Sequence, residues 1–341
     1  MTNQNVFASE AILKGEADLK DSIESLSQFE EKIQPKESPT EALKSCILKS
    51  KSPFSPWIYL AYYRLGNWLI SGNANQQNSI LNLITEVDEA ISNNNGTIKK
   101  TGEVCAYGDN AIASSGLWQS ALSLFQEGGD FIEDLERPED SLLLHWQQKV
   151  DIAHQLIRAV DPDLMHLMNQ LQRLVILAKP GPKSVAINES FGGATCFFFR
   201  GASVINAARP QSTIEIMEKI VHEYAHAELF VLGQDQPLCL NTDDDRHKVL
   251  IRKDPRPMNG ILHALYVTGR VAEVMNRLLS HDLGELADKK NLLIEANSML
   301  NEQISLGHSS LEQVHKHAKL TTIGDIIVQA SASRLANAQK A

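Results

Sequence analysis

The sequence of 341 residues lacks the features that mark secreted and membrane proteins. Its four cysteines (Cys46, Cys105, Cys196 and Cys239) form no C-x-x-C pair and suggest no disulfide framework. The first residues show no basic region followed by an apolar one, so we identify no signal peptide, and no apolar run approaches the length of a membrane span. We therefore expect a protein of the reducing cytoplasm that does not bind membranes.

The sequence also lacks a run of basic residues. It contains 32 Lys and Arg against 42 Asp and Glu, which gives a net charge of -10. An acidic chain without a basic segment is a poor partner for nucleic acid, so we expect none. Because hydrophobic residues make up 43% of the chain and charged residues 22%, a folded core is expected rather than disorder.

The N-terminal region has the hydrophobic periodicity of amphipathic helices. Trp57, Leu60, Ala61 and Trp68 share one helical face, which we interpret as a core face, with a groove for a partner peptide as the alternative. This region contains no motif that indicates a chemical reaction. The segments with helical periodicity are 41–72, 76–93, 110–127 and 138–178.

The pattern changes at Pro180-Gly181-Pro182, which breaks the helical periodicity. Short β-like runs follow at Val185–Ile187, Cys196–Phe199 and Val204–Ile205, and helical periodicity returns at Ser212. We predict an α+β protein that is predominantly helical, with a small sheet just before the next helix. We expect a mostly helical N-terminal region over residues 1–170 and a catalytic region over residues 171–341.

The helix that begins near Ser212 has clear boundaries in the sequence. Ser212 and Glu215 form a capping-box pattern at its start, and Gly233 is a plausible stop. The H-E-x-x-H sequence that runs from His222 to His226 therefore lies inside the helix, away from its ends. This position favours a functional interpretation of the motif.

The spacing of this motif suits a metal ion. Residues four apart on a helix are offset by about 40° and about 6 Å, so the imidazoles of His222 and His226 can converge on one cation. Glu223 is rotated by about 100° from His222, which places its carboxylate at the flank of the metal. From there it can act on a bound water or on a neighbouring group.

A catalytic metal needs a third ligand. His263 lies in an apolar helical stretch, where a buried histidine needs a partner and the metal is a suitable one. The alternative for His263 is a core histidine with other partners. Other ligand candidates are His247, Glu273 and the run Asp243–Asp245, although that run is better explained as a solvated loop.

Two segments together resemble a known family. Val221–His226 (V-H-E-Y-A-H) followed by Asp254–His263 (D-P-R-P-M-N-G-I-L-H) resembles the HExxH peptide-modification proteins, which occur with ribosomal peptide natural-product clusters. The likeness extends from about Gly192 to about Met275. It implies an iron(II)- and 2-oxoglutarate-dependent β-hydroxylase that modifies a side chain of a ribosomally made precursor peptide. Some members are fused to radical SAM enzymes; this chain has no C-x-x-x-C-x-x-C motif, so it would act alone or on a peptide that another enzyme has prepared.

The resemblance implies that His222, His226 and His263 hold the iron. The usual iron oxygenase triad has two histidines and a carboxylate, whereas three histidines also suit zinc. From the residues alone the metal is therefore open, and iron is implied by the resemblance only.

The resemblance also implies an arginine for a carboxylate of 2-oxoglutarate, either Arg252 or Arg256. An arginine suits this task because its guanidinium binds a carboxylate bidentately. Arg256 lies between two prolines, which restrict its backbone, and we rank it first. Arg270 lies two helical turns after His263 and ranks second, ahead of Arg252.

Two other functions stay open. In a zinc metallopeptidase, Glu223 would be the general base on zinc-bound water, and Cys196–Phe199 would form an edge strand that aligns the substrate. The absence of a secretion signal weighs against this function. In a non-catalytic peptide-binding partner, the helical N-terminal region would be the functional part.

Overall fold

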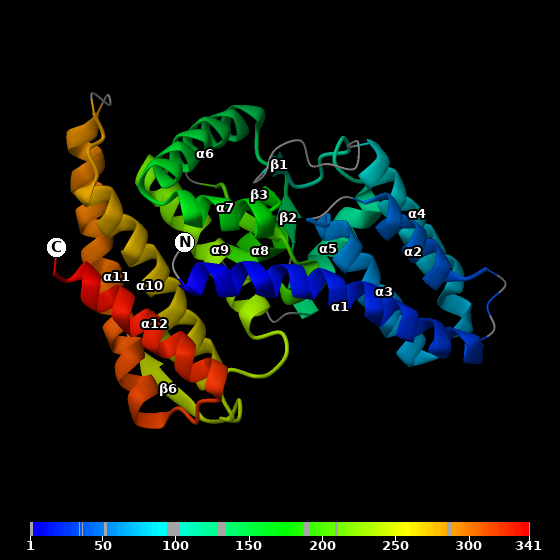
Figure 1. Ribbon diagram of the computed structural model, residues 1–341. Helices are drawn as coiled ribbons and strands as arrows, with labels where there is room; N and C mark the ends of the chain where they lie inside the picture. The colour runs from blue at the N-terminus through cyan, green and yellow to red at the C-terminus, as the bar shows by residue number, and fades with distance from the viewer. Residues whose placement is uncertain are drawn as a thin grey trace. The chain divides into compact units, whose positions relative to one another are not determined.

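The structure is a computed structural model that describes residues 3–33, 35, 37–50, 53–93, 103–127, 134–186, 191–208, 211–284 and 288–340. These residues form mostly helices, together with one five-stranded sheet and one two-stranded sheet (Figure 1). The predicted class, α+β and predominantly helical, is confirmed.

The chain divides into two compact units. The first, which we call the sheet unit, contains Thr2–Gln147 and Leu167–Pro210; the second, the motif unit, contains Gln148–His166 and Gln211–Ala341. The sequence had suggested a division near residue 170. Instead, the sheet groups with the N-terminal helices, and the segment 148–166 groups with the H-E-x-x-H helix.

The sheet unit is built around strand β3 (Leu174–Pro180), whose first five residues are buried. β1 (Glu103–Ala106) and β5 (Ala202–Asn206) pair with it in parallel, and β2 (Leu135–Glu136) pairs with its end antiparallel. β4 (Gly193–Thr195) is antiparallel to β5. The helical elements within this unit are α1 (Asn3–Ile33), α2 (Pro39–Lys49), α3 (Pro56–Ser71), η1 (Ala74–Gln76), α4 (Gln77–Asn93), α5 (Ser115–Glu127), α8 (Pro182–Ala186) and η2 (Phe197–Phe199).

The core of the sheet unit is apolar and aromatic. Trp57, Leu60, Ala61 and Trp68 of α3 are all buried in it, which confirms the predicted core face and leaves no groove for a peptide along these residues. The Trp57 ring lies with its centroid 4.9 Å from that of Phe199. Burial of these rings and of the aliphatic side chains around them stabilises this core.

Of four local predictions for this region, one is confirmed. The helix predicted over residues 138–178 is wrong at residues 174–178, which form most of β3. The strand predicted at Cys196–Phe199 is also wrong, because Phe197–Phe199 form the 3-10 helix η2 and Cys196 is its N-cap. Val185 lies in helix α8, and Ile187 lies outside the described residues. The prediction of a strand at Val204–Ile205 is confirmed, because both residues belong to β5.

The motif unit is arranged around helix α10, which packs against α9, α11 and α12. At Gly269 of α10 a Cβ atom would lie 3.4 Å from the carbonyl oxygen of Ser331 in α12. A Cβ there would make only ordinary van der Waals contact, so α10 and α12 pack closely at this position without depending on the glycine. Figure 1 shows α10, α11 and α12 side by side in yellow, orange and red. The elements of this unit are α9 (Thr213–Leu232), β6 (Arg246–Val249), β7 (Arg252–Pro257), α10 (Met258–Ser280), α11 (Lys289–His317) and α12 (Thr322–Ala338), together with parts of α6 (Asp140–Val160) and α7 (Pro162–Leu171).

Across the described residues, we find no helix with the length and hydropathy needed to span a membrane.

Candidate metal centre

Helix α9 holds the two motif histidines in a firmly capped helix. The Ser212 hydroxyl accepts a hydrogen bond from the Glu215 amide at 3.2 Å, and the Glu215 carboxylate accepts one from the Ser212 amide at 2.8 Å. The helix ends at Gly233, so both predicted boundaries are confirmed. His222 and His226 lie one turn apart in its middle, and their ring centroids are 5.1 Å apart.

Helix α10 brings His263 to this motif. The Nδ1 atoms of His226 and His263 are 3.3 Å apart. Two imidazole nitrogens that bind one tetrahedral ion at about 2.0–2.1 Å would be separated by about 3.3 Å, so the pair has the spacing of two ligands. Phe230 packs beside the His263 ring, with centroids 5.3 Å apart, and covers one side of it. His263 thus lies where a third ligand was expected, while metal binding itself stays a prediction.

Glu218 orients the first motif histidine. Its carboxylate lies one turn before His222 on α9 and is 3.2 Å from the Nδ1 atom of that ring. Its other oxygen pairs with Lys219 at 2.9 Å. When Nδ1 donates its proton to Glu218, the lone pair of the ring is on Nε2, and this is the arrangement by which carboxylates orient histidine ligands of metals.

Electrostatics favours neutral imidazoles at His226 and His263. Burial lowers the pKa of both rings; at His226 the charges of His222, His263 and Arg256 add to this effect, and at His263 the charge of Arg256 does, so that the pKa of His263 falls to about 4. A histidine must be neutral to bind a metal, so both rings are in the required form at neutral pH.

His222 and Glu218 show the opposite effect. Burial alone would lower the pKa of His222, but the hydrogen bond to Glu218 and the charges of Glu223 and Glu218 outweigh it and raise the pKa. Burial alone would raise the pKa of Glu218, but the hydrogen bond from His222 and the charges of His222 and Lys219 lower it to about 2. Glu218 is therefore ionised at any pH at which the protein would work.

Glu223 is buried in α9, where 2% of its surface is exposed. Its charge is among those that raise the pKa of His222, so the carboxylate lies near that ring. This agrees with the flanking position that helical geometry predicts for it. The position suits either a proton-transfer role or a role in orienting a ligand.

Arg256 lies close to the histidine pair. It belongs to β7, where it is the cross-strand partner of His247 in β6. Its side chain passes over Gly260, where a Cβ would lie 3.7 Å from the Arg256 Cδ. Since its charge lowers the pKa of both His226 and His263, a positive group stands beside the proposed metal position.

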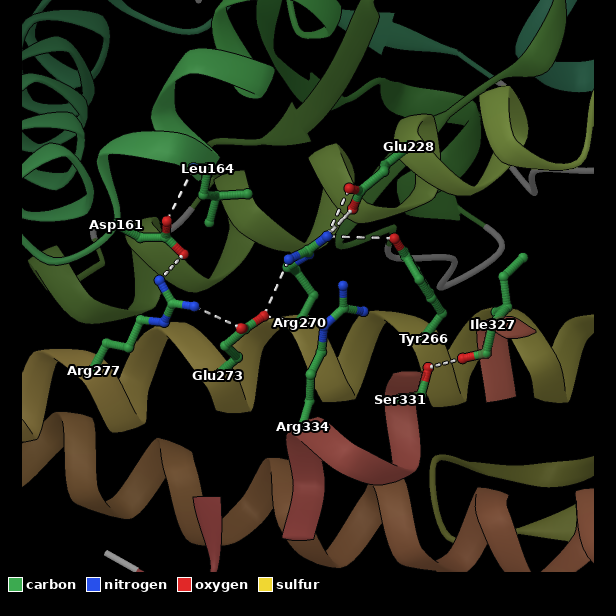
Figure 2. A network of polar contacts seen from close by, with 10 residues as sticks. All are labelled: Asp161, Leu164, Glu228, Tyr266, Arg270, Glu273, Arg277, Ile327, Ser331 and Arg334. Atoms are coloured by element: carbon green, nitrogen blue, oxygen red, sulfur yellow. Dashed lines mark hydrogen bonds and ion pairs between the residues drawn. The ribbon is translucent and has the colours of Figure 1, made fainter. Parts of the chain in front are cut away.

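The other two arginines differ from Arg256. The guanidinium of Arg270 is buried and makes a bidentate ion pair with Glu228, with Nη2 2.6 Å from Oε1 and Nε 3.1 Å from Oε2 (Figure 2). Its Nη1 bonds Glu273 at 3.0 Å, so the structure gives this guanidinium two protein carboxylates in place of a co-substrate. Arg252 begins β7, but its side chain lies outside the described residues.

The other ligand candidates are engaged elsewhere. Glu273 forms ion pairs with three arginines at 2.8–3.0 Å and lies about 15 Å along α10 from His263, at 1.5 Å per residue. His247 pairs with Asp245 at 2.9 Å and stacks on His317 with centroids 4.1 Å apart. In the described part of the chain, no three His, Cys, Asp or Glu side chains already surround one metal-sized point.

Comparison with known proteins adds no relative. No family model matches the chain, and no curated protein matches it. The description of the site therefore rests on its own geometry: two histidine nitrogens at ligand spacing, a third histidine oriented by Glu218, and Arg256 beside them.

Two residues of this region were missed by the sequence analysis. Glu218 could have been found, because it precedes His222 by four residues and therefore shares its helical face. Glu228 gave no such signal, because its partner Arg270 is 42 residues further along the chain. Only the packing of α10 against α9 brings these two side chains together.

Proposed function

We propose that the chain is an iron(II)- and 2-oxoglutarate-dependent oxygenase that hydroxylates the β-carbon of a side chain in a ribosomally made precursor peptide. The observation that carries the proposal is the histidine pair at 3.3 Å with the charge of Arg256 acting on both rings. A dicarboxylate co-substrate needs a metal that binds one of its ends and a cationic side chain nearby that pairs with its other carboxylate.

Each residue has a defined task in this proposal. His222, His226 and His263 would hold the iron and leave its remaining positions for 2-oxoglutarate and dioxygen. Iron held there would supply the oxidative chemistry, in which dioxygen is the oxidant: one oxygen atom would enter the peptide C–H bond, and the other would enter succinate as 2-oxoglutarate loses carbon dioxide. Glu218 would keep the His222 ring in the orientation and tautomer that a ligand needs.

Arg256 would bind the carboxylate of 2-oxoglutarate that is remote from the metal. An unpaired carboxylate is costly to bury, and the planar guanidinium can meet it with two hydrogen bonds. Arg270 is a weaker choice for this task, because Glu228 and Glu273 already bond its guanidinium. Arg252 stays a third candidate.

Glu223 distinguishes this reaction from peptide hydrolysis. A zinc metallopeptidase needs Glu223 as the base on a metal-bound water, whereas an oxygenase needs no such base. The edge strand that a peptidase was expected to use at Cys196–Phe199 is a 3-10 helix. No observation on the described residues therefore favours the peptidase over the oxygenase.

The proposal is tested by metal content and co-substrate binding. Protein purified without added metal is analysed for iron and zinc, and 2-oxoglutarate is then titrated into the iron-loaded protein without oxygen. We expect the protein to contain iron and to bind 2-oxoglutarate saturably.

The reaction is tested next. A mixed peptide library is incubated with the protein, and the masses of its peptides are followed. A gain of one oxygen supports the proposal. A protein that binds zinc, ignores 2-oxoglutarate and cleaves peptides only when Glu223 is intact is a metallopeptidase, and one with neither activity is a binding partner.

A further inference from the structure

A buried ion pair joins the two helices that carry the histidines. Glu228 of α9 and Arg270 of α10 are 1% and 3% exposed, and three nitrogen–oxygen contacts of 2.6, 2.8 and 3.1 Å connect them. Figure 2 shows the two side chains reaching toward each other between the helices. The proposed catalytic residues use neither group.

The helical positions of these residues place the ion pair opposite the histidines. On α9, Glu228 follows His226 by two residues and points about 200° away from it. On α10, Arg270 follows His263 by seven residues, so the two share a face and are about 10 Å apart, which is close to the diameter of a helix. Because His263 meets His226 while Arg270 meets Glu228, α10 contacts α9 on both flanks.

The surroundings of Arg270 restrict its conformation further. Glu273 bonds its Nη1 at 3.0 Å, and the Tyr266 ring lies 5.9 Å from the guanidinium carbon. Glu273 also pairs with Arg277 at 2.8 Å and with Arg334 at 3.0 Å, so the removal of Arg270 would leave Glu273 with two cationic partners. The guanidinium is thus held in one plane and in one direction.

Such an ion pair fixes the relative position of two helices more than it adds to the free energy of unfolding. Replacing a buried ion pair by apolar side chains of similar size is often neutral or stabilising, because desolvation opposes the attraction of the charges. A bidentate pair, however, is satisfied only in one relative position of the two helices, since both hydrogen bonds weaken when α10 slides or rolls over α9. Apolar contacts tolerate such shifts.

We propose that Glu228 and Arg270 are positioning residues for the metal centre: their ion pair fixes the crossing of α10 over α9 and so holds the His226 and His263 nitrogens at ligand spacing. This inference rests on the proposed function, because it assumes that the histidines bind a metal. Neither residue would touch the metal or the substrate.

The test separates position from stability. In the double variant Glu228→Met and Arg270→Met the charges are removed together, and the side chains keep similar lengths. The control is the double variant Asp161→Asn and Arg277→Met, which removes another ion pair of α10, 2.7 Å long, that joins a half-buried arginine to a buried carboxylate and does not reach α9. Asn retains the N-cap that Asp161 provides for Leu164. The melting temperature, the iron(II) affinity by chelator competition, and the visible spectrum of the cobalt(II)-substituted protein are measured.

We expect the Met pair to melt within a few degrees of the wild type, to bind iron(II) about 10–100-fold more weakly, and to show an altered cobalt(II) spectrum. The control pair should keep both the affinity and the spectrum. Unchanged affinity and spectrum in the Met pair, or equal losses in the control, would overturn the positioning role.

Two further measurements keep the test decisive. If the Met pair does not fold, Arg270→Lys serves, because it retains the charge and loses the bidentate geometry. A weaker affinity supports the inference, and wild-type affinity refutes it. The wild-type protein is titrated first. If it binds no metal, the proposed function fails. If it binds metal and the variants bind the metal equally well, only the positioning role of the ion pair fails.

Discussion

The two units bury their carboxylates in different ways. In the sheet unit, Glu16 accepts a hydrogen bond from the Phe54 amide at 2.7 Å, and Glu30 accepts one from the Thr40 amide at 3.1 Å. Both amides are near the beginning of a helix, so these carboxylates satisfy backbone groups, and Glu30 also accepts a hydrogen bond from the Ser38 hydroxyl. In the motif unit, buried carboxylates also meet basic or histidine side chains: Glu228 meets Arg270 of another helix, and Glu218 meets His222 on its own helix.

The different partners of the buried carboxylates correspond to the different positional requirements of the two units. An apolar core such as that around Trp57 is stabilised by contacts that depend weakly on direction. The motif unit places two histidines from different helices at 3.3 Å, and such a distance needs directional contacts. Buried charge is therefore concentrated where the position of one helix against another matters for the proposed chemistry.

The largest expected effect comes from breaking one buried pair. Glu228→Leu leaves the Arg270 guanidinium with one fewer carboxylate in a buried position, so the free energy of unfolding should fall by about 3–5 kcal/mol. Glu30→Ala in the sheet unit should lower it by only about 1–3 kcal/mol, because a backbone amide loses one acceptor. Urea unfolding of the two variants measures both. Equal losses would remove the distinction between the units.

The second prediction concerns the third histidine. His263→Ala should weaken metal binding as fully as His226→Ala does, by more than about 100-fold, because loss of a ligand exceeds the 10–100-fold effect of changing a ligand's hydrogen-bond partner. His145→Ala in the sheet unit is the matched control and should bind metal normally. Chelator competition measures the affinities. Normal binding by His263→Ala would assign the third ligand elsewhere.

The third prediction concerns the arginine anchor. Arg256→Ala should weaken 2-oxoglutarate binding by about 30-fold or more, since removal of one partner of a buried charge pair costs about 2–5 kcal/mol. Metal binding should persist, and Arg256→Lys should restore little because an ammonium cannot bind bidentately. Arg246→Ala, on the neighbouring strand, is the control. Anaerobic titration of the iron-loaded proteins gives the answer, and an unchanged affinity in Arg256→Ala removes this residue from the site.

The fourth prediction concerns the carboxylate behind His222. Glu218→Gln keeps the size of the side chain but removes the charge that holds the imidazole. We expect metal affinity to fall by about 10-fold, the lower end of the range for such partners. Chelator competition measures the change. Affinity equal to that of the wild type would show that Glu218 serves only Lys219.

The fifth prediction concerns His154, a half-buried histidine of α6. Burial in α6 lowers the pKa of His154 to about 4, whereas a histidine in the unfolded chain titrates near 6.5. As the pH falls from about 6.5 toward 4, the unfolded chain binds a proton that the folded protein rejects, so the free energy of unfolding decreases. His154→Gln should reduce this slope, and the exposed His281→Gln should not. Urea unfolding at several pH values measures it.

The sequence predicted best what local patterns determine. The boundaries of α9 follow from Ser212, Glu215 and Gly233, all of which act within a few residues of the chain. β3 was missed because a continuous apolar run, here buried at five successive residues, is typical of both a buried strand and a buried helix. Its parallel partners come from distant segments and give no local signal.

The arginines of the candidate site show in the same way that the sequence does not reveal contacts between distant segments. Helical spacing correctly places Arg270 on the face of α10 that carries His263, but it does not reveal that Glu228 already occupies the guanidinium. Arg256 was ranked first because of its flanking prolines; its charge lowers the pKa of the His226 and His263 rings, and its role stays a prediction. Contacts between distant segments decide which carboxylates an arginine meets, and the sequence does not reveal them.

Strand β7 passes directly into helix α10, and Pro257 is both the last residue of the strand and the N-cap of the helix. No loop separates the Arg256 backbone from the helix that carries His263, so a displacement of one is transmitted to the other. Ligands at the two residues would then be thermodynamically coupled. By reciprocity, whatever factor a carboxylate at Arg256 adds to metal affinity, the metal adds to carboxylate affinity. When that factor exceeds one, loss of either ligand weakens the binding of the other by the same factor.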